Sequence, residues 1–188
     1  NAMTNIGHII NNNGVPNTII EIGAYEGHTT VTMSDLLTPY NHNLKIYAID
    51  PHVGSVEIEE DPELLHNNFM FNINECKHKN IEYIRKYSED GLIDLINRGI
   101  KAEFIYVDGD HRAPTVLTDL VLSFKLLVKG GIMLCDDATD WKYVDKNGTA
   151  SAQMSPRLAI EMFIACNWHN IEIISLPNMG QTAFRKTC

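Results

Sequence analysis

The sequence predicts an α/β protein built on a mostly parallel sheet of seven strands, with helices on both faces. Short β-branched, apolar runs alternate with segments of helical pattern along the chain. These runs are apolar throughout rather than at every second residue, which is typical of strands buried on both faces. A glycine turn also joins the first run to a helical segment, as in an open α/β sheet. We therefore expect helix-covered strands with their ligand site at one edge of the sheet.

The elements are expected in a regular order. Strands are predicted at residues 18–22, 45–50, 81–84, 103–107, 132–135, 171–175 and 182–185, and helices at 29–37, 62–77, 89–98, 114–128 and 156–167. Pro114 and Pro156 fit the first helical position, and Ser155 fits the N-cap. The loop 176–180 is too short for a helix, so the last two strands should form an antiparallel hairpin at a sheet edge.

Length and composition limit the function classes. The 188 residues predict one domain, residues 3–188, with Asn1-Ala2 before Met3 as the scar of a cleaved tag. The net charge of −9 argues against nucleic acid as a partner, because phosphate contacts need a basic face. No apolar run has the length of a membrane span, and the four cysteines lack paired spacing. We expect a cytoplasmic protein without a membrane partner; a homo-oligomer is compatible with the sequence but no pattern specifies it.

Gly23 and Gly27 mark a tight turn between the first predicted strand and the first predicted helix. Free backbone N–H groups at a helix start favour a carboxylate or phosphate. Glu21 and Glu26 flank the turn, and they would repel a pyrophosphate but suit a ligand with its own positive charge. S-adenosylmethionine carries a sulfonium, an ammonium and a carboxylate, so the turn is expected to bind it.

Acidic residues end three further strands. Asp50 lies 27 residues after Gly23, where a carboxylate can accept hydrogen bonds from both ribose hydroxyls of a nucleoside. Neighbouring parallel strands should bring Asp108 close to Asp136 and Asp137. Crowded carboxylates repel one another unless a cation neutralises them, and oxygen ligands suit Mg²⁺ or a similar divalent ion.

Two residues near this acidic cluster have other expected roles. Asp110 is the acid best explained by capping the next helix rather than by metal binding. His111 follows Asp108 by three residues, and a histidine near its ordinary pKa is a suitable general base at neutral pH. The irregular segments 52–61 and 138–154 follow strand ends and are the expected walls of a substrate pocket.

With these residues assembled, the chain resembles the class I S-adenosylmethionine-dependent methyltransferases, and among them the small O-methyltransferases of the macrocin and mycinamicin type (Methyltransferase family 24-like). The resemblance rests on four segments in order, Glu21-Ile-Gly-Ala-Tyr-Glu-Gly27, Tyr47-Ala-Ile-Asp-Pro51, Tyr106-Val-Asp-Gly-Asp-His111 and Gly130-Gly-Ile-Met-Leu-Cys-Asp-Asp137. It implies a Rossmann-like sheet of order 3-2-1-4-5-7-6 with strand 7 antiparallel.

The resemblance also implies roles for individual residues. Glu21 would contact the methionine ammonium and Asp50, followed by Pro51, the ribose. The glycine loop, with the helix start, would hold the methionine moiety through Gly23, Ala24, Tyr25, Gly27 and Thr29. Ser88, in the loop before the third helix, would lie against the adenine. In metal-dependent members, residues matching Asp108, Asp136 and Asp137 bind Mg²⁺, and one matching His111 is the base.

The predicted function is metal-assisted O-methylation of a small hydroxylated acceptor of the sugar, polyketide or phenolic type. Asp108 and His111 are the expected catalytic residues, acting through metal binding and proton removal. Two alternatives stay open. A nicotinamide-dependent oxidoreductase would show G-x-G-x-x-G, whereas this turn has G-x-x-x-G with acids around it. A cofactor-binding module that has lost its activity would have no need of the acidic cluster.

Overall fold

The sheet positions every element of the candidate site. The computed structural model describes residues 2–54, 61–139 and 152–188. Its strands are β1 (Thr18–Ile22), β2 (Lys45–Ile49), β3 (Ile81–Ile84), β4 (Ala102–Val107), β5 (Leu127–Cys135), β6 (Ile171–Ile174) and β7 (Thr182–Lys186). They form one sheet of order β3-β2-β1-β4-β5-β7-β6, in which β7 runs antiparallel to both neighbours. The predicted order and the predicted edge hairpin are confirmed.

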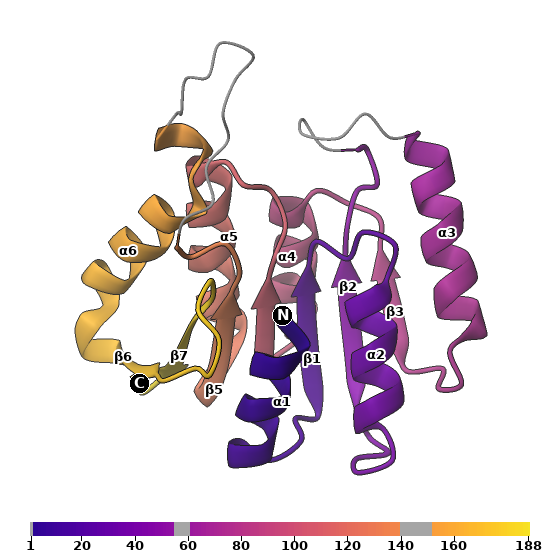
Figure 1. Cartoon of the computed structure of the whole chain (residues 1–188), viewed down its shortest axis with the longest axis horizontal. Helices are drawn as coiled ribbons and strands as arrows, with labels where there is room; N and C mark the ends of the chain where they lie inside the picture. The colour runs from indigo at the N-terminus through magenta and orange to yellow at the C-terminus, as the bar shows by residue number, and fades with distance from the viewer. Residues whose placement is uncertain (1, 55–60, 140–151) are drawn as a thin grey trace.

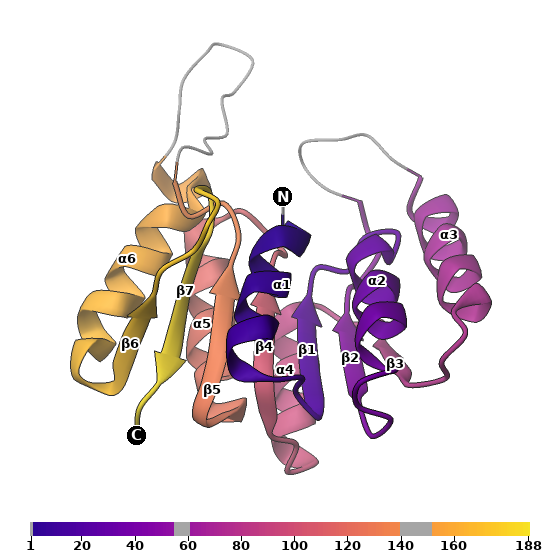
Figure 2. The same cartoon turned by 60° about the horizontal axis from the view of Figure 1, so that its bottom comes forward.

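Helices cover both faces of this sheet (Figure 1). They are α1 (Ala2–Asn13), α2 (His28–Leu37), α3 (Pro62–Glu75), α4 (Ser88–Asn97), α5 (Ala113–Leu126) and α6 (Pro156–Asn167). Figure 2 shows α1 and α2 in front of the sheet and α4 and α5 behind it. Because successive strand residues point to opposite faces, Ile19 packs with the α1 and α2 layer and Ile20 with the α4, α5 and α6 layer.

The structure differs from the predicted elements in two places. Helix α1 was not expected, although Ile6, Ile9 and Ile10 follow the helical spacing and are buried. Strand β5 begins at Leu127 instead of residue 132, because Leu127 pairs with Ala102 before a register shift. Ser155 occupies the N-cap position of α6 as expected, but its side chain makes no capping hydrogen bond.

The carboxyl ends of the central strands form one level edge. Each strand ladder continues by one hydrogen bond beyond the strand end: Asp50 donates its N–H to Ile84, Asp108 to Ile22, and Asp136 to Val107. The three acids therefore lie at the same edge, as the parallel arrangement predicted. The two predicted pocket walls, 52–61 and 138–154, are only partly described. Residues 140–151 lie outside the described residues, and so do residues 55–60 with Glu57, Glu59 and Glu60.

Within the described residues, none of the helices has the length and apolar character needed to cross a bilayer.

Candidate functional site

Asp50 and the glycine turn form one hydrogen-bonded unit. The Oδ2 atom of Asp50 accepts from the backbone N–H of Ala24 at 2.9 Å and of Tyr25 at 2.8 Å. Its Oδ1 atom accepts from the backbone N–H of His52 at 2.7 Å. A carboxylate has about four acceptor positions, so one remains for a ligand hydroxyl. The backbone N–H groups of Ala24 and Tyr25 therefore point to Asp50, whereas the helix start expected to face a ligand carboxylate lies at His28.

The turn needs glycine at Gly23 for a reason beyond ligand approach. Gly23 has φ 83°, and a Cβ atom added there would lie 1.9 Å from the carbonyl oxygen of Asp108. The ends of β1 and β4 thus touch through their backbones. Gly27, with φ 81°, is the N-cap of α2 and faces the ring of Phe69. At both positions a side chain would be disfavoured by the left-handed backbone conformation and would also meet a close neighbour.

Among residues 2–54, 61–139 and 152–188, three other than glycine adopt the left-handed backbone conformation, and all three follow strands of the site edge. They are Tyr25 with φ 49°, His52 with φ 48° and Asp137 with φ 52°. This conformation costs roughly 1–2 kcal/mol for an L-residue. Such residues concentrate at functional sites, where surrounding bonds hold them in place.

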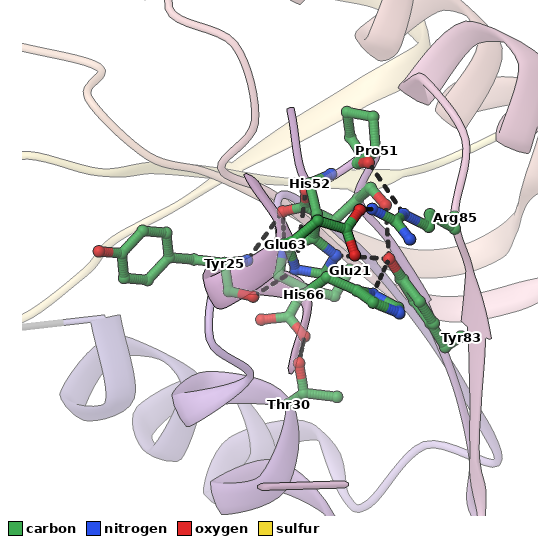
Figure 3. Close-up of polar contacts among 11 residues, drawn as sticks. Glu21, Tyr25, Thr30, Pro51, His52, Glu63, His66, Tyr83 and Arg85 are labelled. Atoms are coloured by element: carbon green, nitrogen blue, oxygen red, sulfur yellow. Dashed lines mark hydrogen bonds and ion pairs between the residues drawn. The ribbon is translucent and has the colours of Figure 1, made fainter. Parts of the chain in front are cut away.

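Glu21 is buried below the turn, with an exposed fraction of 1%. Its Oε2 atom accepts a hydrogen bond from the hydroxyl of Thr30 at the start of α2, as Figure 3 shows. Burial is the main cause that raises the pKa of the Glu21 carboxyl to about 8; the Thr30 hydrogen bond lowers the pKa, and the charges of Asp108 and Asp50 contribute to the rise. A positively charged ligand group nearby would favour its ionised form.

Tyr106 connects the acids at the ends of β4 and β5. Its hydroxyl lies 2.7 Å from Oδ2 of Asp108 and 2.5 Å from Oδ2 of Asp136. The same Asp136 oxygen accepts from the amide of Gln181 at 2.9 Å, and its Oδ1 accepts from the backbone N–H of Asp137 at 2.9 Å. Burial, followed by the charge of Asp136, raises the pKa of Asp108 to about 7.

A second set of contacts brings His111 into the acidic cluster. Its Nε2 atom lies 2.9 Å from Oδ2 of Asp137. One ligand atom each from Asp108, His111 and Asp137 falls within 4.8 Å of the others, and all three side chains are partly exposed. Two carboxylate oxygens and an imidazole nitrogen are a donor set that fits a divalent cation.

Asp136 is placed differently from the other two predicted metal ligands. Both of its oxygens are engaged by hydrogen bonds, and it lies outside the group formed by Asp108, His111 and Asp137. Asp136 thus holds Tyr106 and Gln181, and because one acceptor position remains by the count used for Asp50, its role as a metal ligand stays a prediction. Asp110 accepts from the backbone N–H and the side chain of Arg112, and since Arg112 itself is the N-cap of α5, Asp110 bonds next to the helix start without capping it.

The remaining predicted cofactor residues lie along the same edge. Thr29 and Ser88 are partly buried at the starts of α2 and α4, and the carbonyl of Pro51 lies 3.5 Å from Nε of Arg85. Tyr87 precedes Ser88 and is 60% exposed. These residues thus lie along the edge that runs from the glycine turn past Asp50 to α4.

Sequence reasoning missed five residues that shape this edge. They are Thr30, His52, Tyr106, Asp119 and Gln181. Asp119 is buried on α5, neither of its carboxylate oxygens has a hydrogen-bond partner among the described residues, and burial raises its pKa to about 7. Of these, only Tyr106 belonged to a segment that carried the family resemblance.

Two cavities mark opposite ends of the sheet. A small one is lined by the strand ends and α6, including Asp108, His111, Asp137 and Ile160. A larger one, of about 320 Å³, lies where the strands begin and is lined by residues such as Asn17, Lys129 and Arg185. The larger cavity contains none of the predicted site residues, so we place the chemistry at the smaller one.

Comparison with known proteins gives a family match. A family model described as a methyltransferase domain matches residues 20–138, which include the glycine turn, Asp50 and all the acids of the cluster. An uncharacterised protein of Acanthamoeba polyphaga mimivirus is 30% identical over 131 residues. That alignment covers 67% of this chain and 53% of the relative, so the chain spans about half the length of this curated relative.

Solved structures with the same fold cover nearly the whole chain. An O-methyltransferase of Streptomyces achromogenes involved in tomaymycin synthesis, solved in complex with SAM, has a TM-score of 0.69 at 15% identity, covering 100% of this chain and 80% of its own. A Bacillus cereus O-methyltransferase in complex with SAH has a TM-score of 0.69 at 18% identity, covering 95% and 78%. At these identities the likeness shows the fold.

Proposed function

The chain belongs to the family defined by this methyltransferase domain, and from that membership we propose that it transfers a methyl group from S-adenosylmethionine to a hydroxyl oxygen of a small acceptor. One observation carries the proposal. The turn at Gly23 touches the backbone of Asp108, so a methyl donor held by the turn would lie beside the group Asp108, His111 and Asp137. Methyl transfer needs the methyl donor and the acceptor oxygen to be held next to each other and in line.

The cofactor assignment has support from the site and from proteins of the same fold. The Streptomyces and Bacillus O-methyltransferases were solved with SAM and SAH. In this chain Asp50 has one acceptor position left for a ribose hydroxyl, and Glu21 becomes a suitable partner for an ammonium once it ionises. The residues proposed to contact the cofactor are Glu21, Gly23, Ala24, Tyr25, Gly27, Thr29, Asp50, Pro51, Ser88 and Asp108.

The acidic cluster is proposed to activate the acceptor. Asp108 and Asp137 would hold Mg²⁺ or a similar divalent ion, and a bound ion of this kind lowers the pKa of a hydroxyl that it contacts. His111 takes the proton from that hydroxyl as general base. Tyr106 and Gln181 fix Asp136 behind the cluster, so that Asp136 orders the ends of β4 and β5.

Ligand binding tests the cofactor assignment against the alternatives. We expect S-adenosylhomocysteine to raise the melting temperature of the protein and NAD to leave it unchanged. A shift with NAD alone would favour the oxidoreductase, which the family match does not favour. Turnover of radiolabelled S-adenosylmethionine with sugar, polyketide and phenolic acceptors then distinguishes an enzyme from a binding module, since a module would bind without product.

The Asp108→Asn variant tests the role of the cluster. It removes one charge from the proposed metal ligands, so we expect turnover to fall at least about 100-fold and EDTA to inhibit the parent. Asp110→Asn is the matched control, because Asp110 lies two residues away but bonds to Arg112 outside the cluster, and it should retain activity. Equal activity of D108N and parent, without inhibition by EDTA, would refute the metal but leave methyl transfer intact.

His111 can be assigned by comparing metal affinity with turnover. If His111 acts as base, His111→Gln should lose turnover while its affinity for Mn²⁺, measured by calorimetry, stays close to that of the parent. A parallel loss of affinity would instead make the Nε2 atom a third metal ligand, as its position in the group of three allows.

A further inference from the structure

His52 contacts the glycine turn beside Asp50, with its Nε2 atom 3.9 Å from Oδ1 of that acid. Its imidazole is buried, with an exposed fraction of 1% for the residue, and its Nε2 atom lies 2.6 Å from the carbonyl oxygen of Tyr25. A carbonyl can only accept, so Nε2 carries the hydrogen and donates it. The ring of a neutral histidine then has its acceptor at Nδ1, which bonds to the hydroxyl of Tyr83. Figure 3 shows the ring between Tyr25 and Tyr83.

The position of the ring is fixed by its surroundings. Its centroid lies 5.0 Å from the ring of Phe69, 5.3 Å from Tyr83 and 5.7 Å from His66. The Tyr83 hydroxyl also lies 3.4 Å from Nδ1 of His66 and 3.3 Å from the carbonyl oxygen of Asp50. An imidazole held by an aromatic group on several sides has little freedom to turn away from the carbonyl that it bonds.

The bonds converge on one strained residue. Asp50 accepts a hydrogen bond from the N–H of Tyr25, and His52 donates one to the carbonyl of Tyr25. Both peptide units of this residue are therefore held while its φ is 49°. Tyr25 as a residue is 47% exposed, so these backbone bonds lie close to the protein surface. These two hydrogen bonds from residues that follow β2, together with the 2.7 Å bond from the Gly27 N–H to the Ala24 carbonyl, hold the conformation of the turn.

We propose that His52 is a positioning residue, which keeps the Ala24–Tyr25 turn in its ligand-binding conformation through a hydrogen bond from Nε2. For the cofactor itself this inference rests on the proposed function. His52 does not touch the reacting atoms, and its effect reaches the cofactor through Tyr25. The order of the turn before any ligand arrives is a separate property of the apoprotein.

Two conservative variants separate the side-chain role from a backbone role. Glutamine places an amide N–H near the position of Nε2, whereas asparagine reaches only the position of Nδ1. Asparagine nevertheless tolerates φ 48° better than glutamine does. If His52 acts through Nε2, His52→Gln should preserve function better than His52→Asn. If only the backbone conformation matters, the order reverses.

Hydrogen exchange of the ligand-free protein is the first measurement. We expect the amides of Ala24 and Tyr25 to exchange at least tenfold faster in H52N than in the parent and within threefold of the parent in H52Q. His66→Gln is the matched control, because His66 lies in the same aromatic group but contacts the Tyr83 hydroxyl instead of the turn, and it should match the parent. Exchange in H52N as slow as in H52Q would overturn the proposal.

Affinity for S-adenosylhomocysteine, measured by calorimetry, is the second readout. We expect it to fall about tenfold in H52N and less than threefold in H52Q. If the parent binds no S-adenosylhomocysteine, the proposed function fails, and the exchange rates still decide the role of His52. If H52N does not fold, the ¹⁵N spectrum of the parent decides: a proton on Nε2 and none on Nδ1 supports the proposal, and the opposite tautomer overturns it.

Discussion

Glu21 has an exposed fraction of 1%, and burial raises the pKa of its carboxyl from 4.5 to about 8. In the ligand-free protein at neutral pH this side chain therefore holds a proton for most of the time. The hydroxyl of Thr30 donates a hydrogen bond to this carboxyl. An ammonium group that binds beside Glu21 would displace the proton, so cofactor binding should release protons below pH 8.

The free energy of unfolding of the ligand-free protein should depend on pH because of Glu21. Between pH 4.5 and about 8 the folded protein keeps a proton on Glu21 that the unfolded chain has released. The contribution of Glu21 to the free energy of unfolding therefore falls as the pH rises through this window. Glutamine does not titrate, so this pH-dependent decrease should be absent in Glu21→Gln. The stability of the variant relative to the parent should therefore increase from pH 5 to pH 8.

Urea unfolding at pH 5 and pH 8 measures the effect. Glu75→Gln serves as control, because Glu75 is exposed at the end of α3, and it should leave the pH dependence of the parent unchanged. An E21Q variant whose stability follows the parent at both pH values would show that the carboxyl ionises normally in the folded protein.

For single residues, the sequence predicted which acids lie at the site edge of the sheet, but not which side chains they contact. Asp50, Asp108, Asp136 and Asp137 were found because each follows an apolar run. The engagement of Asp136 by Gln181 joins residues 45 positions apart, and a single sequence holds no signal for such a side-chain contact. The group of Asp108, His111 and Asp137 likewise depends on rotamers that only packing determines.

The glycine turn is the element on which the proposed cofactor site depends. Gly23 combines φ 83° with the near contact to the carbonyl of Asp108. Gly23→Ala should therefore cost about 3 kcal/mol or more in stability, because strain and a backbone clash add together. Gly99→Ala is the control: Gly99 has φ 70° with open space around it, and the cost there should be about 1–2 kcal/mol.

Thermal and urea unfolding of both variants provide the comparison. Similar losses at the two positions would mean that left-handed strain alone accounts for Gly23 and that β1 and β4 can move apart. A far larger loss in G23A, together with lost binding of S-adenosylhomocysteine, is the expected result.

Element boundaries were predictable where a local pattern set them. Strands β1 and β3 and helix α6 have the predicted limits, and most others differ by one or two residues. Helix α1 was missed because its sequence is rich in asparagine, which has a low helix propensity, and its three isoleucines are a short pattern. The early start of β5, before Gly130-Gly131, follows from pairing with Ala102, which no local signal announces.

Across the whole molecule, α1 is tied to the β6–β7 loop and through it to the acidic cluster. Asn5 is 1% exposed; its Nδ2 donates to Oε1 of Gln181 at 2.7 Å and lies 3.2 Å from the carbonyl oxygen of Asn178. Gln181 then donates to Asp136. The Asn5 contact thus fixes which end of the Gln181 amide faces the acid.

Asn5→Ala should destabilise the protein by about 1–3 kcal/mol, because it leaves polar groups of the loop without a partner. Asn12→Ala is the matched control on α1, since the Asn12 side chain bonds only locally to exposed His8. If Gln181 can then turn its amide, metal affinity should also fall in N5A and not in N12A. Unchanged stability and metal affinity in N5A would show that Gln181 keeps its orientation without α1.

The layered architecture was the most predictable feature at this scale. Apolar runs separated by helices imply a sheet covered on both faces, and the short loop before β7 implies the hairpin. The strand order came only from the family resemblance, because periodicity says nothing about which strands become neighbours. The connection from α1 to the far hairpin spans more than 170 residues and had no sequence signal.

The left-handed backbone conformation limits which substitutions this chain can accept at three positions, Tyr25, His52 and Asp137. Valine, isoleucine and threonine rarely accept that conformation. A randomised library selected only for soluble expression should therefore lose β-branched residues at all three positions and gather asparagine and glycine there. Engineers who seek new acceptors would do better to vary the partly exposed surface around α6 than these three anchors of the backbone.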